Sequence, residues 1–264
     1  MKKYIMRKII KNLLRLLKIK PDLESMNDES WEVRWQVARR IGVEHLPKMM
    51  NDKDYYIRCR VAERIDPNHL PKMIKDKDDY VRLEVARRIA VEHLPKMMND
   101  ENSNVRWEVA ARVGREGGAF ANEHLPMMMN DESYSVRWEV AKRIGSEGGA
   151  FAIEHLPKMM NDNHSHVRLK VAERIASEGG AFAGEHLPKM MNDNHSHVRR
   201  EVAKRIDPKY LPKMMNDKGS GVRLEVAKRI DPKFLGEMFG VDFDPEYQRG
   251  LIKVLAERED LRRV

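Results

Sequence analysis

The sequence of 264 residues is poor in several residue types, and each shortage excludes a class of structure. A single cysteine, Cys59, excludes an intramolecular disulfide and any zinc or iron–sulfur site built from several cysteines. No apolar run approaches the roughly 20 residues that a membrane-spanning helix needs. Aromatic residues make up 6% of the chain and charged residues 35%, which indicates a thin core under a large polar surface. A lone thiol suits a reducing compartment, and we therefore expect a cytoplasmic protein.

Acidic residues are missing from the first 20 positions, which carry eight lysines and arginines. This segment accounts for the whole net charge of +8, because residues 21–264 hold 42 basic and 42 acidic residues. Charges interrupt its apolar residues and no small-residue cleavage site follows, so it does not resemble a secretory signal. The neutral remainder argues against a nucleic-acid surface along the whole chain.

The rest of the chain consists of a two-block repeat. The first block is V-R-x-x-V-A-x-R-I or a close variant, and it begins at Val33, Ile57, Val81, Val105, Val136, Val167, Val198 and Val222. The second block resembles EHLPKMMND, and its aromatic position is filled by His45, His69, His93, His124, His155, His186, Tyr210 and Phe234. These positions are spaced by 24, 24, 31, 31, 31, 24 and 24 residues, and residues 146–168 return as residues 177–199 with one difference. Such periods predict a stack of structural repeats.

Each repeat is predicted to hold one longer and one short helix. Val33, Val37 and Ile41 fall on one stripe at 100° per residue, which makes the first block an amphipathic helix. In the second block, the proline after leucine fits a first helical turn, and only a short α- or 3₁₀-helix fits before Asn-Asp. Asp, Asn and Ser then precede the next helix as N-caps. Such a unit cannot bury its own apolar stripe, so we predict an all-α solenoid of eight 24- or 31-residue repeats.

The sequence VRLEVARRIAVEHLPKMMNDENSN at residues 81–104 resembles the leucine-rich repeat variant, and the resemblance covers about residues 30–260. It implies a right-handed superhelix whose units pair an α-helix with a 3₁₀-helix. The broader class of HEAT-like repeats is also similar, above all to the 31-residue units. A known member of the variant family carries a cysteine-rich iron–sulfur segment. A chain with Cys59 alone lacks that segment, so we expect no cofactor.

The chain is predicted to have three regions. Residues 1–28 form a basic N-terminal capping helix, residues 29–240 the eight repeats, and residues 241–264 a C-terminal capping helix. LESMND at residues 23–28 is a loose copy of the second block, so the first region is a degenerate repeat whose apolar face covers the end of the solenoid. The alternative for residues 1–20 is a peripheral contact with an anionic membrane or with phosphates.

An aspartate lies six residues before an arginine in every repeat, which indicates a structural role rather than one binding site. We expect these residues to form a ladder, because an arginine at the margin of a buried stripe needs a carboxylate to offset its desolvation. The resemblance to HEAT-like repeats implies the same ladder. The pairs are Asp28–Arg34, Asp52–Arg58, Asp76–Arg82, Asp100–Arg106, Asp131–Arg137, Asp162–Arg168, Asp193–Arg199 and Asp217–Arg223.

Two sets of aromatic side chains are candidates for partner binding. The first set is Trp35, Trp107 and Trp138, which share one position of the first block. That position favours packing between layers over an exposed aromatic stripe. The second set is Phe120, Phe151 and Phe182. These lie in the insertion REGGAFA or SEGGAFA, at an edge where solenoids often bind partners, and the glycine pairs of the insertion are expected to end the first helix.

Histidines give a weak indication of metal binding. Two loops carry His-x-His pairs, which are His164, His166, His195 and His197. Stacked pairs fit zinc or nickel, but loop histidines beside Asn and Ser are more often solvated, so we predict no metal site.

No residue pattern of the sequence is typical of catalysis. The Glu-His of the second block resembles the His-Glu pairs of HEAT-like deoxyhypusine hydroxylase only superficially, because the order is reversed and Tyr210 and Phe234 replace the histidine. No nucleophile with a neighbouring base occurs, so no catalytic residue is predicted.

These patterns favour a non-enzymatic repeat scaffold that binds a protein partner along a repeated surface through many weak contacts. No disulfide-linked partner is expected. The alternative is a nucleic-acid-binding HEAT-like protein, including a base-excision enzyme similar to alkylpurine DNA glycosylases. It would use aligned lysines at equivalent positions, which are Lys48, Lys72, Lys96, Lys158, Lys189 and Lys213.

Overall fold

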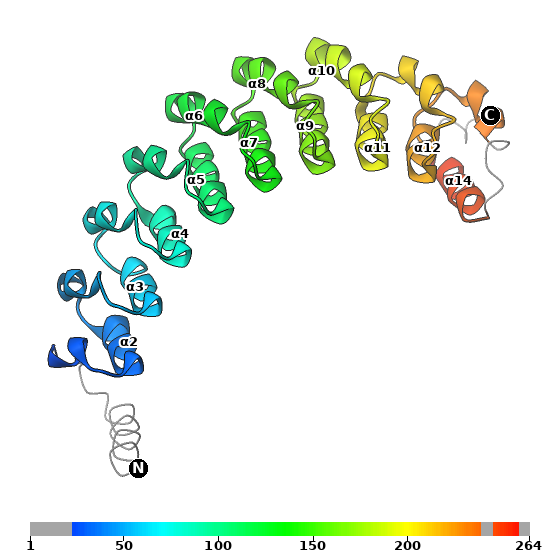
Figure 1. Ribbon diagram of the computed structural model, residues 1–264. Helices are drawn as coiled ribbons and strands as arrows, with labels where there is room; N and C mark the ends of the chain where they lie inside the picture. Colours follow the sequence, from blue (N-terminus) through cyan, green and yellow to red (C-terminus); the bar gives the residue numbers. More distant parts are fainter. Residues whose placement is uncertain (1–22, 239–244, 259–264) are drawn as a thin grey trace. The chain divides into compact units, whose positions relative to one another are not determined.

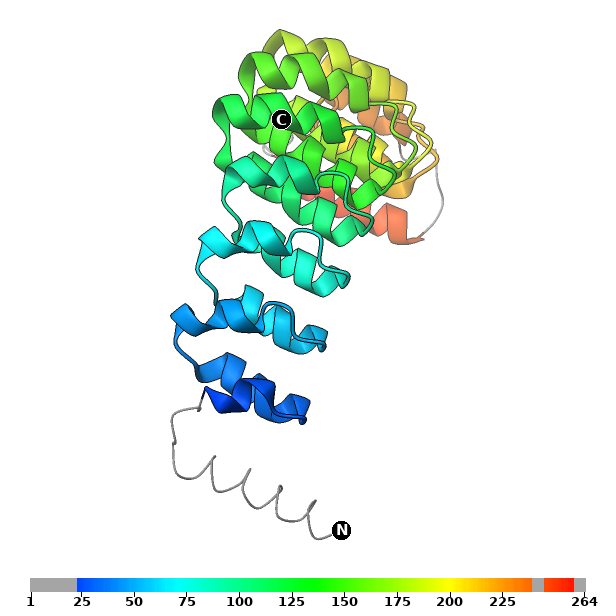
Figure 2. The same ribbon diagram turned by 60° about the vertical axis from the view of Figure 1, so that its left-hand side comes forward.

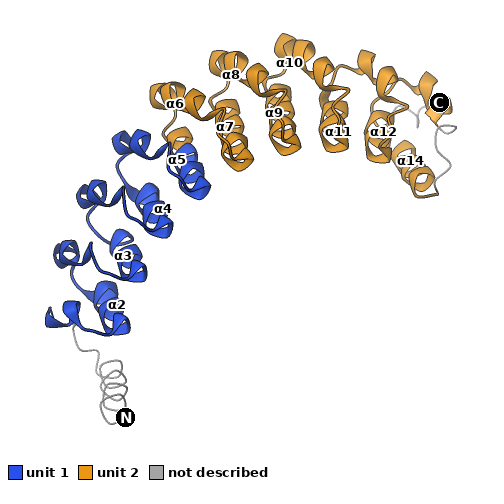
Figure 3. Ribbon diagram, viewed as in Figure 1, with its two compact units in different colours: residues 1–112 blue, residues 113–264 orange. Residues whose placement is uncertain are grey.

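The computed structural model describes residues 23–238 and 245–258. Over these residues the regular elements are α-helices and 3₁₀-helices, with no strand. The chain forms two compact units, Met1–Arg112 and Val113–Val264, which Figure 3 shows in different colours. The expected all-α solenoid of helix and short-helix repeats is therefore confirmed within each unit.

Unit 1 is a stack of 24-residue repeats. Its long helices lie side by side on one face and its short helices on the other, as Figures 1 and 2 show. The long helices are α2 (Trp31–Arg40), α3 (Tyr55–Ala62), α4 (Asp79–Arg88) and the first part of α5 (Ser103–Glu116). The short 3₁₀-helices are η1 (Glu24–Asn27), η2 (Val43–Met49), η3 (Pro67–Met73) and η4 (Val91–Met97).

Unit 2 contains the longer repeats and shows the same separation of long and short helices (Figure 1). Its long helices after α5 are α7 (Tyr134–Glu147), α9 (Ser165–Glu178), α11 (Ser196–Arg205) and α12 (Ser220–Ala227). The short α-helices of the insertions are α6 (Gly118–His124), α8 (Gly149–His155) and α10 (Gly180–His186). The remaining elements are η5 (Leu125–Met128), η6 (Leu156–Met159), η7 (Leu187–Met190), η8 (Pro208–Met214), η9 (Pro232–Phe234), α13 (Leu235–Met238) and α14 (Pro245–Glu257).

Helices begin and end where the sequence supplies a cap. The Asp54 carboxylate accepts a hydrogen bond from the Tyr56 backbone N–H at 2.9 Å and thereby caps α3. In the longer repeats, Gly148 ends α7 with a φ of 67°, a left-handed conformation that glycine adopts without strain. This is the role expected for the glycine pairs, and it allows α8 to begin at the next residue.

The short helix differs between the two repeat lengths, which corrects the expectation for its proline. In the 31-residue repeats, a four-residue 3₁₀-helix follows the short α-helix, and Pro126 lies in its first turn as expected. In the 24-residue repeats, the proline lies inside a seven-residue 3₁₀-helix, so the predicted first-turn position is wrong for Pro47, Pro71, Pro95 and Pro212. Such a short 3₁₀ segment tolerates the proline because only one i to i−3 hydrogen bond is lost.

The core of each unit is built from the same apolar positions of successive repeats. In the third repeat, Val85 and Ala86 of α4, Ile89 at the C-cap of α4, and Leu94 of η4 all have no exposed surface. Equivalent residues are buried in the neighbouring repeats, as the predicted stripe requires. A long helix and its short helix therefore form one layer that must stack on the next.

The last described helix, α14, packs against α12 and buries Tyr247, Leu251 and Val254. The predicted C-terminal capping helix covers residues 241–264, of which the structure describes residues 245–258. The predicted N-terminal capping helix falls on residues 1–22 for most of its length, outside the described residues. Among the helices described, none combines the length and the apolarity that crossing a membrane requires.

Candidate functional site

Within both units, ladder arginines bind the aspartate of the following repeat. In unit 2, Arg168 donates from Nε to Asp193 Oδ2 at 2.6 Å and from Nη2 to Asp193 Oδ1 at 2.9 Å. Its Nη1 donates to the backbone carbonyl of Asp162 at 2.8 Å. The Arg168 and Asp193 side chains are only 9% and 8% exposed. The same rung recurs at Arg34–Asp52, Arg58–Asp76, Arg82–Asp100, Arg137–Asp162 and Arg199–Asp217.

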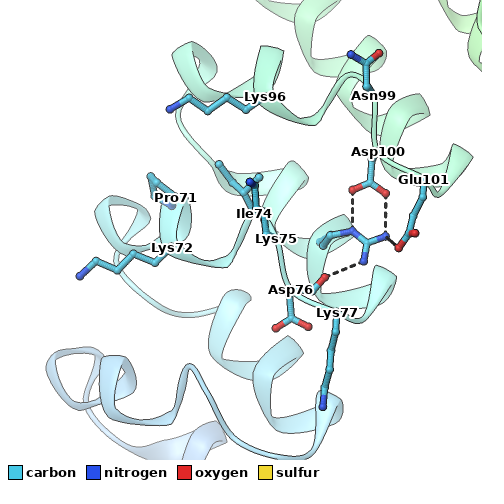
Figure 4. A pocket seen from close by; sticks show the side chains of 11 residues that line it. Pro71, Lys72, Ile74, Lys75, Asp76, Lys77, Lys96, Asn99, Asp100 and Glu101 are labelled. Atoms are coloured by element: carbon cyan, nitrogen blue, oxygen red, sulfur yellow. Dashed lines mark hydrogen bonds and ion pairs between the residues drawn. The ribbon is translucent and has the colours of Figure 1, made fainter.

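The carboxylate of each rung comes from the next repeat, whereas the aspartate six residues before the arginine offers its backbone carbonyl. Figure 4 labels Asp76, Asp100 and Glu101 of one rung in unit 1, and each of the three accepts a hydrogen bond from Arg82. Asp100 also accepts a hydrogen bond from the Asn102 backbone N–H at 2.9 Å, just before α5 begins. One aspartate therefore fixes both the arginine of the preceding repeat and the start of its own long helix.

The rungs keep both partners charged. The hydrogen bond that Arg168 donates to Asp193 raises the pKa of Arg168, although burial acts in the opposite direction. Burial acts to raise the pKa of Asp193, but the hydrogen bonds from Arg168 and from the His195 backbone N–H outweigh it and hold that pKa below its ordinary value. These carboxylates are engaged within the stack, which agrees with a structural role.

A second set of arginines joins neighbouring repeats, and sequence reasoning missed it. Arg229 of α12 donates to the carbonyl oxygens of Ala203 and Ile206 at the C-terminal end of α11, both at 2.8 Å. These carbonyls have no partner within their own helix, so a cation at that helix end is stabilising. The same contact is made by Arg64, Arg88, Arg112 and Arg258. In the sequence, this contact could have been found from the last arginine of V-A-x-R-I or its variant, which is Arg64, Arg88, Arg112 or Arg229.

The arginine at this position lies differently where the preceding repeat has 31 residues, as Arg143 and Arg174 show. A Cβ atom on Gly145 would lie 2.4 Å from the Cγ of Arg174 in the next repeat, so the glycine makes room for that side chain. A glutamate of the next repeat then reaches the start of the short helix: Glu178 accepts a hydrogen bond from the Gly149 backbone N–H at 3.0 Å. An acidic side chain at a helix N-terminus is favourable, which gives the glutamate of SEGGAFA a structural role.

The phenylalanines of the insertions are half-buried and lie against a histidine of the same short helix. The ring centroids of Phe151 and His155 are 4.5 Å apart, and those of Phe120 and His124 are 4.3 Å apart. Phe182 and His186 repeat the arrangement at 4.6 Å. The structure therefore places these candidate residues in adjacent layers of unit 2, on the short-helix face, with each ring only partly accessible.

An open groove of about 790 Å³ runs between α6 and α8 on this face of unit 2. Met127 and Pro126 line it on one side, and Ala150 and Phe151 line it on the other, together with Asn122, Glu123, Glu154 and His155. Met127 is 67% exposed, the largest exposed fraction among the large hydrophobic side chains of the described chain. The insertion thus creates an apolar surface with carboxylates beside it.

Trp35 and Trp138 lie between layers, in contact with cations of their own repeat and of the next repeat. In unit 1, the guanidinium groups of Arg39 and Arg60 both lie 5.5 Å from the ring centroid of Trp35. In unit 2, Trp138 lies between Lys142 and Lys170. Trp35, Trp107 and Trp138 are half-buried, an arrangement that supports packing between layers.

Exposed aromatic residues at the starts of the long helices were missed from the sequence. In unit 1, the ring centroids of Trp31 and Tyr56 lie 6.2 Å apart, and those of Tyr55 and Tyr80 also lie 6.2 Å apart. Trp31, Tyr56 and Tyr80 are 47%, 54% and 65% exposed. These aromatic residues lie one or two positions before the first block, and this placement was the signal available in the sequence.

The His-x-His loops of unit 2 lie at this same end of the long helices. His164 caps α9 and stacks on Tyr134 with ring centroids 3.7 Å apart. Burial and the neighbouring His166 lower the pKa of His164. No cluster of three or more His, Cys, Asp or Glu that fits a metal ion occurs among the described residues.

The aligned lysines are exposed on the short-helix faces, but they differ in their partners. In unit 2, Lys158 pairs with Glu154 at 3.1 Å, and Lys189 pairs with Glu185 at 2.8 Å. In unit 1, Lys72 and Lys96 border an open cavity of about 870 Å³ that is also lined by Lys75 and Lys77, and Figure 4 shows Lys72 and Lys96 extending from the short helices.

The fold and the ladder define an α-helical repeat protein. A solved structure described as a leucine-rich repeat variant with a novel repetitive structural motif matches with a TM-score of 0.65 and 29% identity, over 79% of this chain and 80% of that chain. The resemblance inferred from the sequence is thereby confirmed: the chain is a helical repeat protein similar to the leucine-rich repeat variant and consistent with HEAT-like repeats.

Two more distant solved structures also match. YibA from E. coli matches with a TM-score of 0.52 and 17% identity, over 88% of this chain and 99% of that chain, and shows the fold alone. Human deoxyhypusine hydroxylase matches with a TM-score of 0.30 and 14% identity, over 89% and 93% of the two chains, which is too low to support an argument. No protein-family profile and no curated protein matches the chain.

Proposed function

We propose that the protein is a non-enzymatic repeat scaffold in the cytoplasm that binds a partner protein on the short-helix face of unit 2. The observation that carries this proposal is the groove between α6 and α8, where exposed Met127 and half-buried Phe151 lie beside glutamates. The recurring aspartates Asp162, Asp193 and Asp217 form buried ion pairs with arginines of the ladder. This structural use of the carboxylates supports a non-enzymatic protein. Neither a cofactor nor a metal is part of the proposal.

Photo-crosslinking within cells tests this proposal. A photoreactive phenylalanine analogue is placed at Phe151 on the proposed face, and in a control chain at Lys142 on the long helix α7. We expect position 151 to crosslink a defined protein that position 142 does not, and that protein to bind the purified scaffold. If both positions give the same crosslinked products, or position 151 gives none, the proposed face is wrong.

Nucleic-acid binding is the second candidate, and the lysines of unit 1 favour it. In that unit, the second-block lysines lie on 3₁₀-helices, where a residue and its fourth successor are 120° apart. Lys48 therefore makes no ion pair with Glu44 within the described chain, unlike Lys158 with Glu154 in unit 2. The lysines of unit 1 keep their charge available for phosphates.

Fluorescence anisotropy with labelled DNA and RNA over a salt series tests this candidate. Replacing Lys48, Lys72 and Lys96 by alanine in the full chain is expected to reduce the slope of log K against log salt by about three, one for each phosphate that a lysine no longer neutralises. The matched control replaces Lys158 and Lys189, which already have carboxylate partners. An unchanged slope, or no binding by the parent chain, eliminates this candidate.

A further inference from the structure

Unit 2 contains near-copies of the same short-helix surface, and the differences between them single out one groove. The segments are ANEHLPMMMND at residues 121–131, AIEHLPKMMND at residues 152–162 and AGEHLPKMMND at residues 183–193. They differ at the second position and at the seventh, where Met127 replaces a lysine. The groove between α6 and α8 contains this methionine, and so differs from the corresponding surface of the next layer.

The replacement of lysine by Met127 leaves one carboxylate unneutralised. In the later copies, the lysine ammonium pairs with the glutamate four residues earlier, as Lys158 does with Glu154 at 3.1 Å. The equivalent pair in the first copy would join Glu123 and residue 127, and methionine cannot form it. Glu123 is exposed and has no ion pair or hydrogen bond within the described chain. Glu154 lines the other side of the groove, but Lys158 already neutralises it.

The same replacement makes the groove apolar. A lysine would extend a charged group over this surface, whereas the Met127 side chain is 67% exposed and lines the groove opposite Ala150 and Phe151. Methionine adapts its shape to different apolar partners because it is unbranched and polarisable. The groove therefore offers an adaptable apolar surface with a single unpaired carboxylate, Glu123, at its side.

We propose that this groove binds a peptide segment of a partner protein that carries a lysine or arginine next to a large apolar side chain. The apolar side chain packs on Met127 and Phe151, and the cation pairs with Glu123. The carboxylate of Glu123 and the open apolar lining of the groove match this chemistry better than that of a small enclosed ligand. This inference rests on the proposed protein-binding function and names the chemistry of the partner.

Two substitutions taken from the chain itself make the test specific. Met127→Lys copies the later repeats, so it should fold normally, neutralise Glu123 and remove the apolar surface. Lys158→Met performs the reverse exchange in the next layer and frees Glu154, so it should create a second site of the same kind. Thermal unfolding followed by circular dichroism checks that both variants keep the parent fold.

The experiment selects binders from a random twelve-residue peptide library on the full-length chain, and then measures the affinity of the selected peptides by anisotropy. We expect the peptides to pair a basic residue with a large apolar residue, to lose about tenfold in affinity for Met127→Lys, and to bind Lys158→Met with two sites. Glu123→Gln should remove the preference for the basic residue while it keeps the preference for the apolar one.

Two outcomes overturn the inference. Peptides that bind the parent and Met127→Lys equally well exclude the groove but leave the protein-binding function intact, because those peptides bind elsewhere. A selection that enriches no peptide on the parent chain also excludes the groove. The photo-crosslinking experiment then decides separately whether any protein binds this face.

Discussion

Removing one aspartate from the ladder should destabilise unit 2 far more than removing an exposed aspartate. In the Asp193→Ala variant, Arg168 loses two charge-assisted hydrogen bonds of 2.6 and 2.9 Å in a site where its side chain is 9% exposed. Breaking a buried ion pair from one side costs about 3–5 kcal/mol. Asn194 at 2.5 Å and the Asp162 carbonyl still hold the guanidinium, so we expect a loss of about 3 kcal/mol, near the lower end of that range.

Urea unfolding followed by circular dichroism measures this loss as a change in the transition midpoint. Asp207→Ala is the matched control, because Asp207 caps η8 through the Lys209 N–H at 3.0 Å but belongs to no buried pair. The double variant Arg168→Met with Asp193→Leu should regain most of the lost stability, since it leaves no unpaired charge. Equal losses of stability for Asp193→Ala and Asp207→Ala would refute the argument that the Asp193 carboxylate offsets the cost of burying the Arg168 guanidinium.

Three further predictions follow from single side chains. Gly145→Ala should destabilise the chain by about 1–3 kcal/mol in urea unfolding, because the new Cβ meets Arg174 at 2.4 Å. Gly184→Ala, with nothing within 4 Å, should be neutral or slightly stabilising, and a reversed order would contradict the close contact. Burial raises the pKa of Cys59 to about 12, so a thiol reagent at about pH 8 should modify it only when urea unfolds unit 1. Rapid modification of the native chain would disprove this protection. Burial lowers the pKa of His155 below its ordinary 6.5, so the unfolded chain binds the proton more readily, and stability should fall as the pH drops below 6.5. His155→Tyr should lessen that loss when unfolding is measured at several pH values. If stability depends on pH as it does in the parent chain, other groups cause the loss.

The repeat architecture was predictable because its signal is apolar periodicity repeated eight times. Val85, Ala86 and Ile89 are buried because each lies on the stripe that the first block defines. Glycine at the ends of the long helices was predictable for a similar reason, since its left-handed conformation excludes most other residues.

The contacts between layers were only partly predictable. The sequence identified Asp193 and Arg168 as ladder residues, but spacing along the chain does not reveal which layer supplies the carboxylate. The second arginine contact, made by Arg229, was missed because its acceptors are backbone carbonyls, which have no residue signature.

The candidate groove also required the structure. Phe151 was predicted from the insertion, whereas Met127 stood out only once its neighbours were known. Glu123 has no ion pair because methionine lies at residue 127, where the next copy has a lysine. That comparison needs the structure, in which one helical turn places Lys158 beside Glu154.

The direction of the rungs determines how such a chain can grow. Each rung joins an arginine of one layer to an aspartate of the following layer, as Arg137, Arg168 and Arg199 of unit 2 show. A whole repeat can therefore be inserted between two such layers without leaving a charge of the rungs unpaired. Its aspartate pairs with the arginine of the layer before it, and its arginine pairs with the aspartate of the layer after it. The near-identity of residues 146–168 and 177–199 is what such an insertion would leave behind. Duplication of a repeat therefore lengthens the stack without requiring any compensating change in the layers on either side.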